Sequence, residues 1–348
     1  MTETKVRQSN IELLRIVAIF LVMVGHINGF MAEGRIPPMI ADADSVVIMR
    51  NIIGSLASVC VVLFVLISGW FSIKPNLKSV VTLWTQIFFV YIYCFSIQAV
   101  VGGANLKTLA TCFLPFTMGN WFVRCYLILM LLSPALNYLS ERLTQRGFIL
   151  FLAAFSAIAF LWGCIFPTDA AGFNQGMSPL SLVYVYMVGR FMRLHVQIKR
   201  SKWFWLLGYL LMSLIIFLGR VAHQPWVLYY CNPILVLSAA LLFMFFVRLD
   251  IGHCDFVNWV ASSVFAAFIL HTRAPVFGWL QAFNLEKLHT LPYLQYLCLM
   301  IVVLIAIFMI AILMDKIRAY IFKPVIIFVN RIVILSDYSE KIIIFYQK

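Results

Sequence analysis

Apolar runs long enough to span a membrane recur along almost the whole chain, and they constrain the fold more than any other feature. A helix needs about 20 apolar residues to cross the hydrocarbon core of a bilayer, because each residue rises about 1.5 Å. Runs of this kind lie near 11–30, 51–72, 80–101, 121–140, 147–167, 179–195, 203–220, 227–247, 257–280 and 291–314. The sequence therefore predicts an all-α polytopic membrane bundle of about ten transmembrane helices.

Charged residues are scarce and unevenly placed. They make up 11% of the chain, against about 25% in soluble domains, which excludes a soluble protein. Most lysines and arginines outside the spans fall at the two ends or in the loops after spans two, four, six and eight. The opposite loops hold only Arg35, Arg50, Lys107, Arg220 and Lys287. Because lysine and arginine mark cytoplasmic loops, both termini are predicted to be cytoplasmic. The net charge of +13 then serves orientation and contact with anionic lipid, not nucleic-acid binding.

The first apolar run, 10–30, carries the ionisable residues Glu12, Arg15 and His26. Arg15 and His26 lie eleven positions apart, so both side chains leave one helix face, about 16 Å apart along the axis. Ionisable groups at membrane depth are costly and usually mark a working site. Alternatively, Arg15 is a topogenic anchor that reaches the lipid phosphates, and His26 is a buried histidine satisfied by a backbone carbonyl.

Four elements of the chain resemble the membrane-bound acyltransferase-3 family, over roughly 10–315. They are Arg15-x10-His26 in the first span, Ser68-Gly69 at the end of the second, Trp121-Phe122 at the start of the fourth, and the run FILH at 268–271 in the ninth. The resemblance implies a protein that O-acylates sugars of bacterial surface glycans, with cytoplasmic acyl-CoA as the donor. It also implies an essential arginine and histidine in the first helix, which fall on Arg15 and His26.

Further polar residues are candidates for substrate binding. Arg124 and His271 lie within spans and are candidates to stabilise an oxyanion, and Ser68, Gly69 and Trp121 follow from the resemblance. Lys74, Arg190 and Arg193, near the cytoplasmic boundary, are candidates for the phosphates of acyl-CoA, although topogenic charge explains them as well. Arg220, His223 and Trp226 form a possible sugar-facing patch of low specificity. The eight cysteines are scattered without C-x-x-C spacing, and no metal site is predicted.

These observations predict an O-acyltransferase of the bacterial plasma membrane. It would move an acyl group, most simply acetyl, from acetyl-CoA or another acyl-CoA to a sugar hydroxyl of a surface or lipid-linked polysaccharide, with His26 as general base. Its partners would be acyl-CoA, the glycan acceptor and membrane lipids. The predicted membrane domain covers 1–318 and a cytoplasmic interfacial tail 319–348. A transporter or flippase for an anionic or glycan-lipid substrate is the alternative, and a glycan polymerase is a weaker one. Direct transfer and an acyl-enzyme route both stay open.

Overall fold

The computed structural model describes residues 7–29, 45–114, 120–197 and 199–333, and within them it contains helices and turns but no strand. Eight of the described helical segments, one of which joins α2 and α3, are long and apolar enough to cross a membrane, or nine if one bent pair counts as a span. The predicted all-α polytopic membrane fold is therefore confirmed.

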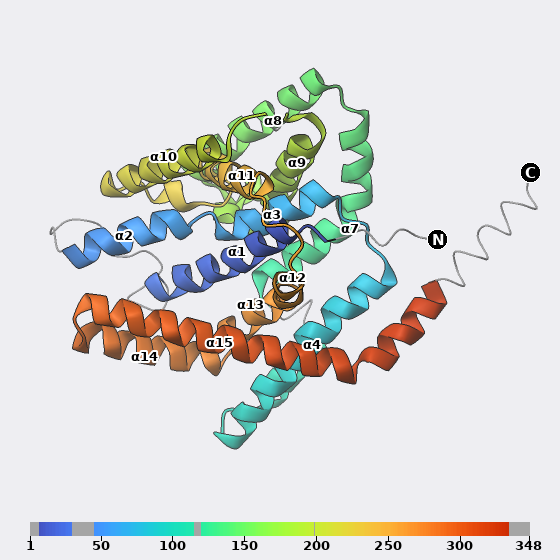
Figure 1. Cartoon of the computed structure of the whole chain (residues 1–348), viewed down its shortest axis with the longest axis vertical. Helices are drawn as coiled ribbons and strands as arrows, with labels where there is room; N and C mark the ends of the chain where they lie inside the picture. The colour runs from blue at the N-terminus through green and yellow to red at the C-terminus, as the bar shows by residue number, and fades with distance from the viewer. Residues whose placement is uncertain (1–6, 30–44, 115–119, 198, 334–348) are drawn as a thin grey trace, which may run out of the picture.

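The helices follow one another with short connections (Figure 1). They are α1 Ser9–Asn28, α2 Ser45–Ala57, α3 Cys60–Phe71, α4 Leu77–Val100, α5 Leu106–Phe113, α7 Trp121–Arg142, α8 Gln145–Phe160, α9 Pro179–His195, α10 Lys202–Val221, α11 Pro233–Val247, α12 Asp255–Ala261, α13 Val264–Thr272, α14 Val276–Thr290 and α15 Tyr293–Ile321. Single helical turns cover Leu161–Ile165, Asp169–Ala171, Asn174–Gly176 and Pro225–Leu228. Many helices begin where a side chain accepts a hydrogen bond from the backbone of the first turn, as at Asn76, Asn105, Thr144, Ser178 and Asn232.

Three predicted spans differ from straight membrane-crossing helices. The second is broken at Ser58 and Val59 into α2 and α3. The ninth is divided into α12–α13 and α14, which meet at an angle of 71° beside Pro275. The sixth corresponds to α9, which has the predicted bounds but only 17 residues, slightly below the length of about 20 residues that a crossing usually takes. The total of ten spans therefore remains a prediction.

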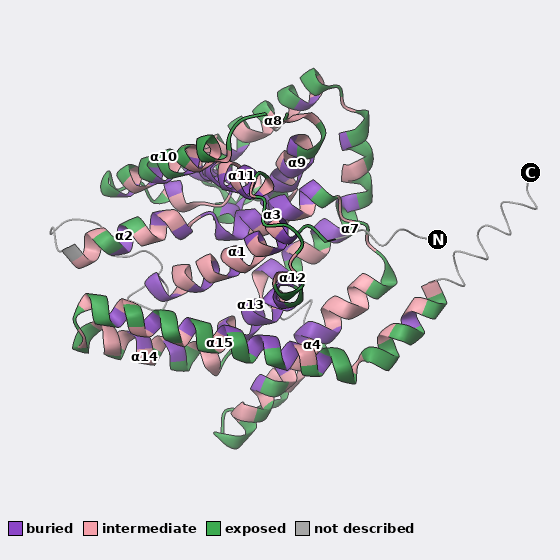
Figure 2. Ribbon diagram, in the orientation of Figure 1, coloured by how far each residue is buried: buried purple, intermediate pink, exposed green. Residues whose placement is uncertain are grey.

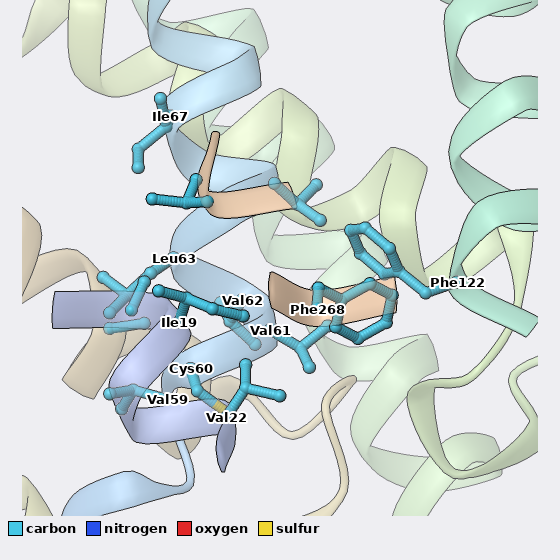
Figure 3. Packing of buried hydrophobic residues seen from close by; sticks show 14 of the residues in the cluster. Ile19, Val22, Val59, Cys60, Val61, Val62, Leu63, Ile67, Phe122 and Phe268 are labelled. Atoms are coloured by element: carbon cyan, nitrogen blue, oxygen red, sulfur yellow. The ribbon is translucent and has the colours of Figure 1, made fainter. Parts of the chain in front are cut away.

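Helix α1 lies at the centre of the bundle and packs against α2, α3, α12 and α13. Buried residues concentrate on these central helices, while exposed residues cover the outer helices (Figure 2). Figure 3 shows Ile19 and Val22 of α1 beside the segment 59–63. The burial of Ile19, Val22 and Met23 agrees with the face that the Arg15–His26 spacing indicates. Apolar packing on this face sets the rotation of α1 and hence the direction of His26.

Helices α3 and α9 cross at very short range, and glycines make the crossing possible. A Cβ atom on Gly69 would collide with the backbone carbonyl of Tyr186. A Cβ on Gly189 would lie 2.6 Å from the backbone oxygen of Leu66. Small residues of this kind let membrane helices approach to backbone contact.

The C-terminal part of the described chain is also helical. Helix α15 continues through the predicted domain boundary at 318 to Ile321, and a further helical segment covers 323–333. Helices α14 and α15 form a hairpin at the left of Figure 1, and α15 then returns toward the side on which α1 begins. The rest of the predicted tail, 334–348, lies outside the described residues, and its interfacial position stays a prediction.

Candidate active site

The centre of the candidate site is a contact between two histidines that lie 245 positions apart. The Nδ1 atom of His26 on α1 lies 3.0 Å from the Nε2 atom of His271 on α13. The ring centroids are 5.1 Å apart, and His271 is only 1% exposed. The break after Thr272 ends α13 just beyond His271, so the bent ninth segment presents this ring to α1.

The hydrogen bonds of His271 determine which nitrogen of each ring carries a proton. His271 Nδ1 lies 2.7 Å from the backbone oxygen of Ala267. A carbonyl oxygen only accepts, so His271 Nδ1 carries the hydrogen, and Nε2 of the neutral ring is an acceptor. His26 Nδ1 must then donate to His271 Nε2. The nitrogen of His26 that has the basic lone pair is therefore Nε2.

His26 lines a cavity of about 440 Å³, a volume within the range of small-molecule sites. Five parts of the chain form its walls. The C-terminal turns of α1 contribute Val22, Gly25, His26, Asn28 and Gly29, and the α2–α3 break contributes Gly54, Ala57, Ser58 and Cys60. Helix α7 contributes Trp121, and the turn at 174–176 with the residue after it contributes Gln175 and Met177. The segment from α10 to α11 contributes Arg220, Pro225, Leu228, Tyr229 and Tyr230.

Trp121 is the second predicted site residue in this cavity. Its ring is stacked on that of Tyr230, with the centroids 6.1 Å apart and the planes 16° from parallel. Flat aromatic faces of this kind suit the apolar face of a sugar ring and exclude water from part of the cavity. The structure thus brings His26, His271 and Trp121 together from three distant parts of the chain.

Arg15 lies apart from this group. Its Nη1 atom is 3.5 Å from Glu12 Oε2, and the two side chains are 35% and 9% exposed. Arg15 is not among the residues that line the His26 cavity. The Arg15 side chain leaves α1 on the same face as His26, but about half the length of the helix separates the two residues. The catalytic role of Arg15 stays a prediction.

A second cavity, of about 430 Å³, lies at the predicted cytoplasmic side. Lys74 and Lys78 line it together with Asn76, Ser79 and Tyr126. Ser68 contacts this region, because its hydroxyl lies 3.1 Å from the Tyr126 hydroxyl. Gly69 faces the α9 backbone at the helix crossing instead.

The remaining predicted cations are not brought into the two cavities. Arg190 is buried and bonded to Ser140 Oγ at 3.0 Å and Glu141 Oε1 at 3.2 Å. Arg193 lies over the Trp70 ring at 5.1 Å. Arg124 is exposed on α7. The positions of these three arginines therefore do not support the prediction that they bind the acyl donor or the substrate.

Some residues in or beside the His26 cavity have no clear signal in the sequence. The sequence places Arg50 in a loop, but α2 begins at Ser45 and carries it into the bundle, where it is buried without lining the cavity. Arg220, a member of the predicted sugar-facing patch, lines the cavity from the C-terminal end of α10. Asn28 and Gly54 were not singled out, because a lone amide or glycine in an apolar run has no functional spacing. Among the described residues, no group of three metal-binding side chains occurs.

The structure thus combines a polytopic helical bundle with a buried histidine pair, of which His26 lines a cavity. The acyltransferase domain family matches residues 8–312, and the chain belongs to this family. It is thus a multi-pass membrane acyltransferase. No curated protein and no solved structure matches the chain.

Proposed function

We propose that this acyltransferase moves an acyl group, most simply acetyl, from acyl-CoA to a sugar hydroxyl of a surface or lipid-linked polysaccharide in the bacterial plasma membrane. The observation that carries the proposal is the contact of His26 with His271 beside the 440 Å³ cavity. This contact leaves the basic lone pair of His26 on Nε2, which is what a general base for a hydroxyl group requires.

In the proposed reaction, His26 Nε2 takes the proton of the sugar hydroxyl as its oxygen attacks the thioester carbonyl carbon. The tetrahedral intermediate then collapses, the C–S bond breaks, and the proton on His26 passes to the departing CoA thiolate. His271 Nε2 accepts the hydrogen bond from His26 Nδ1 throughout and stabilises the positive ring. Because both nitrogens of His271 are engaged in this way, we assign it to positioning His26 and not to stabilising an oxyanion.

The donor is proposed to enter from the cytoplasmic side, where Lys74 and Lys78 line the second cavity and would contact its phosphates. A continuous series of ring contacts leads from this cavity to the histidines. Tyr126 stacks on Phe122 at 5.8 Å, Phe122 contacts Phe268 at 5.5 Å, and Phe268 contacts His271 at 6.1 Å. Phe122 and Phe268 are buried in the core, so these rings would have to move apart for the pantetheine arm to bring the thioester to His26.

The test is acyl transfer by the purified protein in detergent or lipid nanodiscs. Radiolabelled acetyl-CoA is supplied together with surface glycan extracted from cells that lack the gene. Covalent label on the glycan supports the proposal, and mass spectrometry identifies the modified sugar. Movement of substrate across proteoliposomes without any covalent label would instead identify the transporter alternative.

A further inference from the structure

Two buried arginines converge near the C-terminal end of α1, at Asn28, two residues beyond His26. Arg50 on α2 and Arg220 on α10 are 4% and 5% exposed. Arg50 Nη2 donates to the backbone oxygen of Asn28 at 3.1 Å, and Asn28 Nδ2 donates to the backbone oxygen of Arg50 at 2.7 Å. This reciprocal pair fixes α1 against α2 and holds Asn28 on the cavity wall.

A glycine makes room for the second guanidinium. A Cβ atom on Gly54 would collide with Arg220 Nη1 and would lie 3.1 Å from Asn28 Nδ2. Gly54, Asn28 and Arg220 therefore meet at one place, and all three line the cavity that contains His26. Arg220 Nη1 donates to the backbone oxygen of Asn51 at 3.3 Å, which anchors one edge of its guanidinium.

Among the described residues, the other edge of the Arg220 guanidinium has no hydrogen-bond partner. Its Nε and Nη2 atoms are buried and make no hydrogen bond. Within the described part of the chain, neither Arg50 nor Arg220 forms an ion pair. Arg220 donates to the backbone of Asn51, the residue directly after Arg50. Burying a cation without a counter-charge is strongly unfavourable. An unpaired buried cation on the cavity wall, Arg220, with a second buried cation, Arg50, bonded to the neighbouring Asn28, is the arrangement expected of an anion site.

We propose that Arg220 and Arg50 bind a carboxylate or phosphate group of the acceptor, so that the acylated glycan is an acidic one. The free Nε and Nη2 edge of Arg220 has the parallel pair of donors that carboxylate and phosphate accept from arginine. Asn28 lines the same cavity, and His26 lies two residues before it on α1. An anionic group held here places a neighbouring hydroxyl of the same sugar residue near His26. This inference rests on the proposed transfer to a sugar.

The experiment measures ligand binding and not transfer, so it stands independently of the proposed reaction. Full-length protein with His26→Gln is purified, and its thermal unfolding is followed with sodium glucuronate, glucose 1-phosphate or glucose at constant ionic strength. We expect one or both anions to raise the unfolding temperature and glucose to have no effect at equal concentration. Stabilisation by glucuronate alone indicates a carboxylated acceptor, and stabilisation by glucose 1-phosphate alone indicates a phosphorylated one.

Arg220→Gln should weaken anion binding about 10- to 100-fold, since charge-assisted hydrogen bonds are lost. Without ligand this variant should unfold at the same or a higher temperature, because an uncompensated buried charge is removed. Gly54→Ala should weaken binding by displacing the guanidinium. Lys107→Gln, which removes an exposed charge on α5, is the matched control and should bind as the parent does.

Three results would overturn the inference. The first is equal stabilisation by glucose and by the anions in the parent protein, or no stabilisation by any of the three. The second is an unchanged anion response in Arg220→Gln. The third is displacement of glucuronate or glucose 1-phosphate by coenzyme A, which would assign the anion to the donor. Anion binding together with no detectable acyl transfer by the wild-type protein would support this site while contradicting the proposed reaction.

Discussion

At the scale of single residues, one hydrogen bond links the protonation of His26 to that of His271. The Ala267 carbonyl holds the proton of His271 on Nδ1, and His271 Nε2 in turn holds the proton of His26 on Nδ1. A ring that rotates freely would present the basic nitrogen for only part of the time. The hydrogen bond to buried His271, whose own tautomer is fixed, keeps the His26 ring in one orientation.

His271→Ala should therefore lower the rate of acyl transfer by about 10²-fold, because His26 becomes a poorer general base when it loses this hydrogen bond. His271 itself would not contact the substrate. His271→Gln should recover a large part of the rate, because its side-chain oxygen reaches the position of Nε2 and accepts from His26. The measurement is the transfer rate over a range of pH. A purely structural role for His271 predicts equal losses in both variants and an unchanged pH profile.

Arg15→Lys keeps the charge at position 15 but loses the planar pair of donors that binds a carboxylate or phosphate. If Arg15 takes part in donor binding, this variant should lose most of its activity while it inserts normally. The contact with Glu12 offers the simpler explanation of a charge pair at the membrane surface. Transfer near the wild-type rate, measured with equal amounts of inserted protein, would reduce Arg15 to an anchor.

At the scale of helices, the residues at the crossing of α3 and α9 can be interpreted from the sequence in two ways. The pair Ser68-Gly69 suggests substrate binding through the family resemblance, whereas the structure uses Gly69 for backbone contact with α9. Gly69→Ala should therefore destabilise the protein by about 1–3 kcal/mol, the usual range for overpacking.

The check is thermal unfolding of purified Gly69→Ala against Gly278→Ala. Gly278 lies in α14, and a Cβ there meets no atom within 4 Å. This control should be neutral or slightly stabilising, because alanine favours helix over glycine by about 1 kcal/mol. Unaltered stability of Gly69→Ala together with lost activity would favour a substrate-binding role.

The same helices show which features of the fold can be predicted from the sequence and which cannot. Apolar runs of membrane-spanning length located most of the long helices. The Arg15–His26 spacing indicated the face of α1 on which Ile19, Val22 and Met23 are buried. The sequence pattern did not predict the break at Ser58 and Val59, because no proline or charged residue occurs there. It also placed Arg50 outside the membrane helix, since a single cation at the end of an apolar run looks like a loop residue. Contacts such as His26–His271 depend on tertiary packing, and no local pattern contains them.

At the scale of the whole molecule, the distribution of charge predicts the orientation in the membrane. The basic loops after the even-numbered spans put 196–202 and both termini in the cytoplasm. A reporter fused after residue 200 should therefore show cytoplasmic activity, and one fused after Gln224 should show none. The reverse result would move the donor cavity with Lys74 to the opposite side and would contradict the proposed entry of acyl-CoA.

The central claim is that His26 removes the proton of the acceptor hydroxyl, and the most direct test is transfer of labelled acetyl by purified His26→Gln. Glutamine preserves a hydrogen bond but does not accept the proton productively. We predict a rate lower by about 10²–10⁴-fold, with insertion, thermal stability and acetyl-CoA binding close to those of the wild type. Transfer by His26→Gln at a rate near that of the wild type would contradict the mechanism and leave His26 as a packing residue.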